Sequence, residues 1–404
     1  MSDRRHVTPP SRFAARMELV RPSAIRDLLR FGADPDLISF GGGYPDPDLF
    51  PMTELREVLD GLLSGGSSVL QYTVSDGMPR LREQVAERMV RDGVACSASD
   101  VLILQGAQQG LDLVARMLLD PGDVVVTENP TFLGALIAFN PCQPAYAPVR
   151  TDDDGMDTDD LERVLAANPR ARLIYTVPDF GNPTGVTLSL ERRRRLVELA
   201  NRYDVLVLED SPYRELRFAG ERVPTLKSLD TQGRVVFLGS FSKILAPGMR
   251  LGWSVASDDL TGRLGLLKLA ADTQCSTLNM AAASAFLDRY DIDAHIATIR
   301  SAYRRKRDLM LSVIEERFPP SVTHTSPDGG LFTWLTFPEG FDAAAFLRDE
   351  AIPRAKVAYV PGATFFPVTQ EPNHARINFS GVSDERIVEG MTRLAGLLRE
   401  RLPG

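Results

Sequence analysis

Short apolar segments alternate with helical segments from residue 101 onward, and each apolar segment ends in a cluster of polar residues. Alternation at this spacing predicts a doubly wound, mostly parallel sheet with helices on its faces. Because the carboxyl ends of parallel strands meet at one edge of a sheet, the polar clusters are expected to gather where such folds bind ligands. The expected strands are Val101–Leu104, Val124–Val126, Leu173–Val177, Val205–Leu208 and Val235–Leu238.

A chain of 404 residues is too long for one small core. A long charged helix is expected over residues 293–318, and strands alternate with helices from there to the C-terminus. We therefore expect an α/β fold in which a large domain is joined to a smaller α+β domain. The expected division is an N-terminal arm with part of the small domain over 1–48, the large domain over 49–292, and the linking helix with the rest of the small domain over 293–404.

Charge and composition exclude several classes of protein. The formal net charge of −8 argues against a dedicated nucleic-acid binder. The arginine run at 192–195 lies in a helical pattern with acids four residues away, and we interpret it as a solvated, salt-bridged helix face. The acidic run at 152–160 does not have EF-hand spacing. Neither the cysteines nor the histidines have ligand spacing, so no metal site is expected.

The sequence predicts a cytoplasmic protein without a membrane partner. No apolar run approaches the roughly 20 residues of a membrane span. Residues 1–10 are polar and lack the apolar core of a signal peptide. Three separated cysteines fit a reducing compartment.

One loop concentrates groups that suit a phosphate and an aldehyde. The chain has five lysines, and Lys243 is the one flanked by Ser240, Ser242 and Arg250, directly after the strand that begins at Val235. The hydroxyls and the guanidinium suit a phosphate. Only an amine can form a Schiff base, so arginine could not replace this lysine in that chemistry. On this stretch alone, a surface turn with a solvated lysine is an equal alternative.

The other polar clusters would complete a site for a phosphorylated pyridine aldehyde. Such a cofactor needs a carboxylate at its ring nitrogen, donors at its ring oxygen, an anion site and an aromatic face. Each candidate alone has an ordinary structural alternative, such as a helix cap, a core tyrosine or a turn asparagine, but their joint order in one chain favours the cofactor. The candidates are Asp210 for the ring nitrogen, Tyr213 and Asn182 for the ring oxygen, Gly106, Ala107 and Gln108 for the phosphate, and Phe132 for the ring face.

With these motifs the sequence resembles fold-type I pyridoxal-phosphate enzymes, specifically the class I and II aminotransferases and their 2-aminoadipate and kynurenine group. The likeness runs from about residue 21 to the C-terminus. The matching motifs are Ile38–Pro51 (ISFGGGYPDPDLFP), Gln71–Arg82 (QYTVSDGMPRLR), Gln105–Leu111 (QGAQQGL), Glu128–Phe132 (ENPTF), Pro178–Gly185 (PDFGNPTG), Glu209–Leu216 (EDSPYREL), Gly239–Arg250 (GSFSKILAPGMR) and Ala375–Ser380 (ARINFS).

The resemblance implies a role for each motif residue, with pyridoxal 5′-phosphate bound in the large domain. Lys243 would hold the cofactor as a Schiff base and act as general base, Asp210 would pair with the ring nitrogen, and Tyr213 and Asn182 would hold the ring oxygen. Tyr72 would reach the phosphate of the neighbouring subunit, which implies a homodimer. The phosphate would be bound by Gly106, Ala107, Gln108, Ser240, Ser242 and Arg250, and the substrate by Arg376, Gly43, Tyr44, Asn182 and Arg26. Arg376 would bind the α-carboxylate, with a salt bridge at a strand edge as its alternative. Arg26 would bind a distal carboxylate, with a solvated helix residue as an equal alternative.

The implied function is transfer of an amino group from an L-amino acid to a 2-oxo acid. The resemblance implies 2-oxoglutarate as this acceptor, because members of the family usually use it. Two departures leave other chemistry of the same cofactor open, namely decarboxylation, β/γ-replacement or cyclisation, and oxidation. Phe132 stands where many relatives have tyrosine, and Gly181 where a larger residue, often glutamine, is usual. A ligand-binding regulatory domain is a further alternative, although regulators of this kind carry a helix-turn-helix domain and only about 20 residues precede the likeness here.

Overall fold

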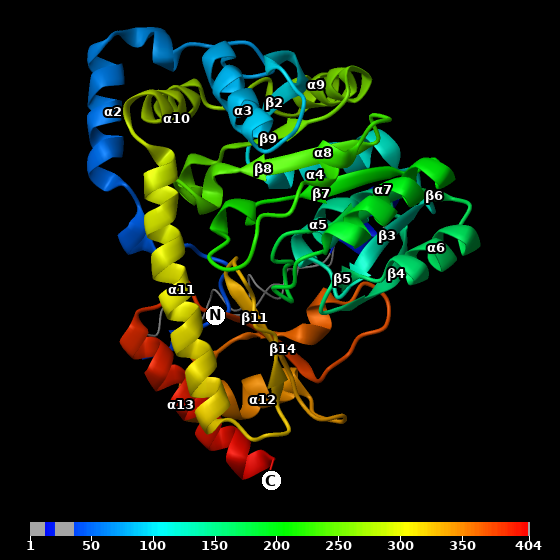
Figure 1. Cartoon of the computed structure of the whole chain (residues 1–404), viewed down its shortest axis with the longest axis vertical. Helices are drawn as coiled ribbons and strands as arrows, with labels where there is room; N and C mark the ends of the chain where they lie inside the picture. The colour runs from blue at the N-terminus through cyan, green and yellow to red at the C-terminus, as the bar shows by residue number, and fades with distance from the viewer. Residues whose placement is uncertain (1–12, 21–35, 403–404) are drawn as a thin grey trace.

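An eight-stranded sheet forms the centre of the upper half of the molecule in Figure 1. Its strands in this computed structural model, which describes residues 13–20 and 36–402, are β2 (Val101–Leu104), β3 (Val124–Asn129), β4 (Ala145–Asp152), β5 (Gly155–Met156), β6 (Ala171–Thr176), β7 (Leu206–Asp210), β8 (Val235–Ser240) and β9 (Gly252–Val255). Their order is β2-β9-β8-β7-β6-β3-β4-β5. The run from β8 to β4 is parallel throughout, which confirms the mostly parallel sheet.

The expected strands are present, and the sheet contains others that the pattern did not predict. β9 pairs antiparallel with both β8 and β2. It has only four residues and begins at Gly252, so it is too short to show a period. β4 has mostly half-exposed side chains and includes Pro148, because it lies towards the edge of the sheet and lacks a continuous apolar run.

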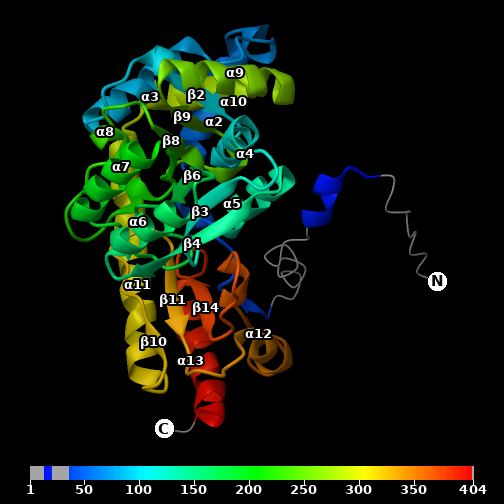
Figure 2. The same ribbon diagram turned by 90° about the vertical axis from the view of Figure 1, so that its right-hand side faces the viewer.

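Helices cover both faces of this sheet, as Figure 2 shows for α4 and α5 on one side and α6, α7 and α8 on the other. Side chains alternate between the two faces along each strand, so Leu173 and Tyr175 join one buried cluster and Ile174 joins the other. Continuous apolar strands therefore suit a sheet buried on both faces. The helices of this region are α2 (Met52–Ser64), α3 (Pro79–Arg91), α4 (Ala107–Leu118), α5 (Leu133–Phe139), α6 (Thr158–Ala167), α7 (Leu190–Tyr203), α8 (Leu226–Leu229), α9 (Asp258–Asp272) and α10 (Thr277–Arg289).

The long helix α11 (Ile292–Arg317) connects the sheet region to a C-terminal unit and packs against α13 (Asp384–Arg401) (Figure 1). This unit holds an antiparallel sheet of order β10-β11-β14-β13. A separate two-stranded sheet pairs residues 38–39 in parallel with residues 357–358 of the same unit. The remaining elements of this part are β1 (Ile38–Ser39), β10 (Thr323–His324), β11 (Phe332–Thr336), α12 (Ala343–Phe346), the π-helical η11 (Leu347–Ala355), β12 (Val357–Ala358), β13 (Val360–Pro361) and β14 (His374–Asn378).

The arrangement agrees with the predicted α/β class, while the domain boundaries stay a prediction. The pairing of β1 with β12 is consistent with a contribution of the N-terminal segment to the small domain. The sequence also predicts a short amphipathic helix over residues 22–30, and this segment lies outside the described residues. Short 3-10 helices complete the fold: η2 (Ala15–Leu19), η4 (Pro47–Leu49), η5 (Ser67–Leu70), η6 (Ala98–Asp100), η7 (Asn140–Cys142), η8 (Arg214–Leu216), η9 (Phe241–Lys243), η10 (Pro247–Met249) and η12 (Gly362–Phe365).

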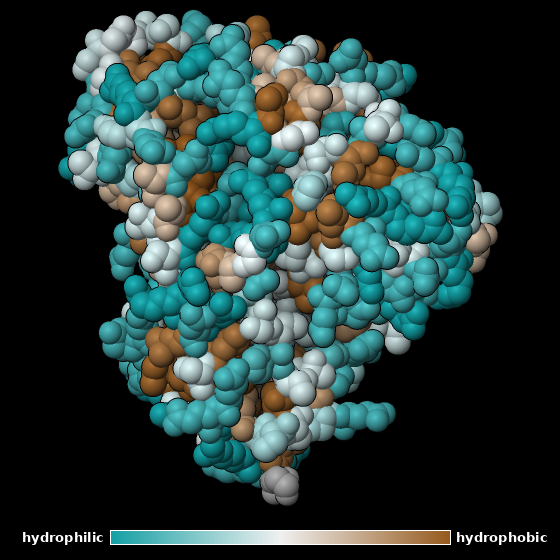
Figure 3. All heavy atoms as spheres, in the orientation of Figure 1, coloured by the Kyte–Doolittle hydropathy of each residue, from teal (hydrophilic) through white to brown (hydrophobic). Residues whose placement is uncertain are grey.

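The face of the molecule shown in Figure 3 is mostly hydrophilic, with small groups of apolar residues between polar ones. Among the described residues, no helix combines the length and the apolar content that crossing a bilayer requires. The same residues contain no cluster of three or more histidine, cysteine, aspartate or glutamate side chains suited to a metal ion.

Candidate active site

A cavity of about 310 Å³ opens where the loops after β2, β3, β6, β7 and β8 meet the segment that follows β1. These loops all leave the carboxyl ends of their strands, which is the edge where the polar clusters were expected. The cavity is lined by Gly43, Tyr44, Pro45, Ala107, Gln108, Leu111, Phe132, Val177, Asn182, Asp210, Pro212, Tyr213, Ser240, Ser242, Lys243, Pro247, Arg250 and Arg376. The structure therefore brings most of the predicted site residues together.

Lys243 lies at the end of η9, and its amine points into this cavity. The turn is closed by Ser240, whose Oγ accepts a hydrogen bond from the Ser242 N–H at 3.1 Å. Lys243 Nζ donates to the carbonyl of Gly43 at 2.7 Å. Burial, with the positive charges of Arg376 and Arg250, lowers the pKa of Lys243 to about 8. Near neutral pH a useful fraction of this amine is therefore unprotonated and nucleophilic.

Asp210 ends β7 and is buried at the floor of the cavity. Its Oδ2 accepts a hydrogen bond from the hydroxyl of Tyr175 at 3.0 Å. Its Oδ1 is buried without a hydrogen-bond partner. Burial raises the pKa of Asp210 to about 7, although the Tyr175 hydroxyl opposes that shift. A buried acceptor without a partner costs about 1–3 kcal/mol, so a charged N–H donor placed in the cavity would be stabilised here.

Asn182, Tyr213 and Arg376 form a continuous chain of hydrogen bonds on another wall. The amide of Asn182 donates to the Tyr213 hydroxyl at 3.3 Å and accepts from Arg376 Nη1 at 2.8 Å. Burial raises the pKa of Tyr213 to about 12, so its hydroxyl keeps its proton. Asn182 and Arg376 are 194 positions apart, and they meet because β14 faces the loop after β6.

Arg376 is a buried cation, 1% exposed, whose hydrogen-bond acceptors are neutral. Besides Asn182, it donates from Nη2 to the carbonyl of Gly41 at 2.7 Å, and its guanidinium lies 4.2 Å from the ring centre of Phe332. Its Nε is buried without a partner. Burial lowers the pKa of Arg376 to about 10. A buried charge held only by neutral groups has unused capacity for an anion, and a carboxylate matches its planar donors.

The start of α4 and the side chain of Arg250 form a cradle for an anion. Gly106 is the N-cap of α4 with φ 75°, so it leaves the first N–H groups of the helix without a side-chain cap. A Cβ atom at Gly106 would lie 2.6 Å from Arg250 Nη2, so any other residue here would displace this guanidinium. Arg250 Nη2 donates to the carbonyl of Gln105 at 3.1 Å. Uncapped helix N–H groups and a guanidinium suit a phosphate, with the hydroxyls of Ser240 and Ser242 on the same cavity wall.

Of the three aromatic residues besides Tyr213 that were predicted to contact the cofactor or the substrate, two line the cavity and Tyr72 does not. Phe132, the N-cap of α5, lines the cavity, as does the half-exposed Tyr44. Tyr72 is 80% exposed and is not part of this wall. Arg26 lies outside the described residues.

The sequence analysis assigned no function to three buried acids near the cavity, which are Glu128, Glu209 and Asp179. Glu128 accepts hydrogen bonds from Thr176 Oγ1 at 2.8 Å and the Val177 N–H at 3.3 Å. Burial, assisted by the charge of Asp210, raises the pKa of Glu128 to about 7. Glu209, next to Asp210, accepts from the N–H groups of α8 instead of pairing with it. Both acids lie at the end of an apolar strand segment. This pattern is visible in the sequence, but it does not distinguish a buried acid from an exposed one.

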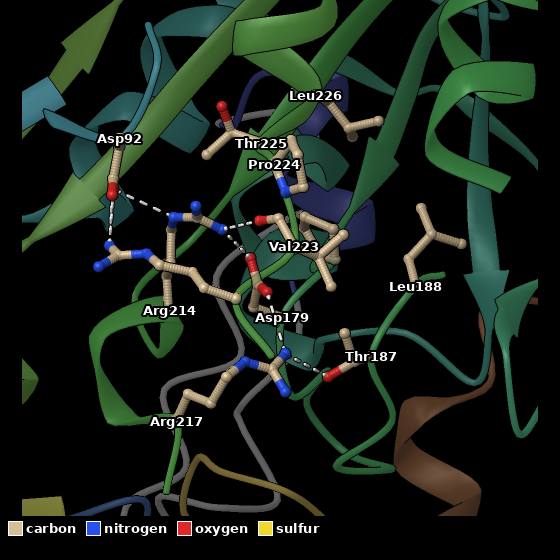
Figure 4. A network of polar contacts seen from close by, with 12 residues as sticks. Asp92, Asp179, Thr187, Leu188, Arg214, Arg217, Val223, Pro224, Thr225 and Leu226 are labelled. Carbon is tan, nitrogen blue, oxygen red and sulfur yellow. Dashed lines mark hydrogen bonds and ion pairs between the residues drawn. The ribbon is translucent and has the colours of Figure 1, made fainter. Parts of the chain in front are cut away.

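The third acid, Asp179, ties together the two loops that carry Asn182 and Tyr213. Figure 4 shows Arg214 and Arg217 converging on its carboxylate, with Asp92 on the far side of Arg214. Arg193 Nη2 donates to Asp179 Oδ1 at 2.9 Å. Burial opposes ionisation, but the charges of these arginines hold the pKa of Asp179 below its usual range.

The prediction that the arginines at 192–195 form a solvated helix face is therefore wrong for one of the four, Arg193. The Arg193 side chain is 0% exposed, because it turns inward from α7 and binds Asp179 with three backbone carbonyls around it. Arg195, in contrast, pairs at the surface with Glu162 and Glu198, as the interpretation expected. A helical pattern of charges does not distinguish these two cases when the buried partner lies on another segment.

Comparisons with known proteins agree with this geometry. The family described as Aminotransferase class I and II matches residues 36–394. The chain is 40% identical to aromatic-amino-acid aminotransferase 1 of Thermococcus litoralis over 95% of this chain and 93% of that one. A crystal structure of Pyrococcus horikoshii kynurenine aminotransferase, in complex with PMP, has a TM-score of 0.92 and 38% identity, covering 98% of both chains.

A third similar protein is LysN, the alpha-aminoadipate aminotransferase of Thermus thermophilus. Its structure, complexed with N-(5′-phosphopyridoxyl)-L-leucine, has a TM-score of 0.89 and 34% identity, covering 96% of this chain and 98% of that chain. This chain belongs to the class I and II aminotransferases, and it is a pyridoxal-phosphate-dependent enzyme that transfers an amino group from an amino acid to a 2-oxo acid.

Proposed function

We propose that the cavity described above is the aminotransferase site, with Lys243, Asp210 and Tyr213 as its catalytic residues. The observation that supports this most strongly is that one cavity holds two complementary groups. They are a half-buried amine of lowered pKa, at Lys243, and a buried carboxylate oxygen without a partner, at Asp210. The first suits the cofactor aldehyde, and the second suits the protonated nitrogen of its ring.

The remaining cofactor contacts follow from the other walls. When bound, pyridoxal phosphate supplies an aldehyde that takes up the amino group and a ring that withdraws electrons from the α-carbon. Tyr213 and Asn182 would donate hydrogen bonds to the ring oxygen, and Phe132 would cover the ring face. The phosphate would be held by Gly106, Ala107, Gln108, Ser240, Ser242 and Arg250.

Arg376 would bind the α-carboxylate of the substrate, and Lys243 would move the proton. The two donors of a guanidinium suit a carboxylate in the bidentate mode, and burial strengthens the pairing. Lys243 Nζ, held by the carbonyl of Gly43, would accept the proton of the α-carbon and deliver a proton to the cofactor within the same half of the exchange, and it would reverse both transfers in the second half. A base whose pKa is about 8 is close to the operating pH, which is where proton transfer is most efficient.

We propose that the donors include amino acids with apolar or aromatic side chains, and that 2-oxoglutarate is the acceptor. The support is the apolar part of the wall, with Leu111, Val177 and Pro45, and the similarity to an aromatic-amino-acid aminotransferase and to a kynurenine aminotransferase. The cations on the described wall are Lys243, Arg250 and Arg376, and each has a proposed function already. Arg26 stays our candidate for the distal carboxylate of an acidic substrate.

Two experiments test these assignments. Borohydride reduction of the cofactor-loaded enzyme should label a peptide that spans Lys243, and a label at another lysine would contradict the site. A screen of amino donors with 2-oxoglutarate should yield the 2-oxo acid and glutamate in equal amounts. Release of carbon dioxide or of hydrogen peroxide in place of glutamate would contradict the proposed reaction.

We also propose a homodimer in which Tyr72 crosses to the partner. Exposed apolar residues gather near it, because the loop after η5 and the face of α9 adjoin each other. A patch of this kind marks an interaction surface. Light scattering should give twice the 44.5 kDa mass of the chain, and a monomer at micromolar concentration would contradict the proposal. The patch consists of Leu70, Tyr72, Val74, Leu266 and Leu269.

We propose a cytoplasmic location as well. Cys96, Cys142 and Cys275 are all free, which fits a reducing compartment. Cell fractionation tests this, and recovery with the envelope or the medium would contradict it.

A further inference from the structure

The hydroxyl of Tyr175 is the feature that distinguishes the two oxygens of Asp210. Tyr175 lies on β6, beside β7, and it is completely buried with its ring edge-on to Phe139 at 5.5 Å. Its hydroxyl donates to Asp210 Oδ2 at 3.0 Å, while Oδ1 is left without a partner. Nothing in the roles that we have assigned to the cavity residues uses this tyrosine.

We propose that Tyr175 is a positioning residue, which holds one oxygen of Asp210 so that the other is presented, ionised, to the ring nitrogen of the cofactor. This inference rests on the proposed function of Asp210. A carboxylate is free to rotate about its terminal bond, and a hydrogen bond to one oxygen selects the orientation in which the second oxygen remains available. The donor is itself fixed, because the Tyr175 ring is enclosed by Phe139 and the core of the sheet.

The same hydrogen bond favours the ionised form of Asp210. Burial alone favours the neutral acid, and a hydrogen bond donated to the carboxylate opposes that effect. Tyr175 is the side chain that lowers the pKa of Asp210 against the effect of burial. Of the other titratable groups nearby, Glu128 has its own pKa raised by the charge of Asp210, Tyr213 keeps its proton, and Lys243 lines the same cavity. Tyr175 is therefore the protein group that preserves the charge needed at the ring nitrogen before the cofactor arrives.

Tyr175→Phe removes the hydroxyl and keeps the ring packing. The probe is pyridoxamine 5′-phosphate, which contacts the ring and phosphate sites without a covalent bond to Lys243. We expect its dissociation constant from the full-length apoenzyme to rise by about tenfold, the effect of one hydrogen bond to a charged group. We also expect the affinity to decline on acidification at a pH about one unit higher than in the wild type, because the pKa of Asp210 is no longer held down.

The matched control is Tyr359→Phe. Tyr359 is equally buried, and its hydroxyl donates to the carbonyl of Ala343 at 2.7 Å, away from the cavity. This variant loses the same chemical group, so it should leave both the dissociation constant and its pH profile unchanged. If both variants weaken binding equally, the effect is a general loss of packing and the positioning function of Tyr175 is excluded.

Asp210→Ala separates this inference from the assignment beneath it. If Asp210→Ala leaves the affinity for pyridoxamine 5′-phosphate unchanged, the proposed site is wrong. If Asp210→Ala weakens binding and Tyr175→Phe does not, only the inference on Tyr175 is wrong. In the Asp210→Ala background, the second change at Tyr175 should have no further effect, and an additive loss would overturn the coupling.

Discussion

Arg376→Lys should remove the preference of this enzyme for a substrate that carries an α-carboxylate. Lysine retains the positive charge but presents a single ammonium, so the two-point contact with a carboxylate is lost. It also leaves the Asn182 amide oxygen and the Gly41 carbonyl, now 2.8 and 2.7 Å from the guanidinium, without those donors. The variant therefore changes recognition and geometry while conserving charge.

The magnitude follows from burial. Arg376 is 1% exposed, and truncating one partner of a buried, hydrogen-bonded charge pair costs about 2–5 kcal/mol. Because lysine keeps the charge, we expect the lower half of that range, which corresponds to a loss of about 30-fold to 400-fold in kcat/KM for an amino acid. The loss should be mainly in KM, because Arg376 holds the carboxylate before and during the reaction.

The assay compares an amino acid with the primary amine that lacks its carboxylate, by following the cofactor absorbance in single turnovers. The kcat/KM of the amino acid divided by that of the amine should fall in Arg376→Lys. The amino acid loses its contact with the guanidinium, whereas the amine has no carboxylate and never made that contact. Arg307→Lys is the control. Arg307 is another buried arginine that donates to a backbone carbonyl, Pro327 O at 2.6 Å, and lies against an aromatic ring. An unchanged ratio in Arg376→Lys, or an equal change in Arg307→Lys, would refute the assignment.

Four further outcomes are expected. Lys243→Ala should abolish turnover but retain the unfolding temperature of the apoenzyme, and substantial residual activity would contradict its function. The rate of pyridoxal phosphate capture by the apoenzyme should rise with pH through about 8 and then level off, because only the neutral amine attacks, and a flat profile would count against this. Asp179→Asn should destabilise the protein by about 3–5 kcal/mol in chemical denaturation, because buried arginines lose their counterion, and a change below 1 kcal/mol would show that the network is dispensable. Tyr72→Ala should weaken cofactor binding in the dimer, and unchanged binding would place the partner contact elsewhere.

Several properties of this protein were determined locally, and the sequence was sufficient for them. The strand and helix periods, together with the polar residues after each strand, predicted the sheet and the edge at which the site lies. Lys243, Asp210 and Asn182 could be nominated because each follows a strand whose carboxyl end reaches that edge. The long charged helix expected over residues 293–318 was also predicted closely, because α11 spans Ile292–Arg317.

The tertiary structure alone decided which groups are paired. Arg193 is buried because its acid partner lies on another loop, so its neighbours on α7 could not reveal it. Tyr175 resembles any core residue of a strand until β7 places Asp210 beside it. Arg376 reaches Asn182 across 194 positions because β14 of the C-terminal unit faces the loop after β6. A periodic pattern encodes which face of an element is buried, whereas burial of a charge depends on what a distant segment supplies, and that information exists only once the chain has folded.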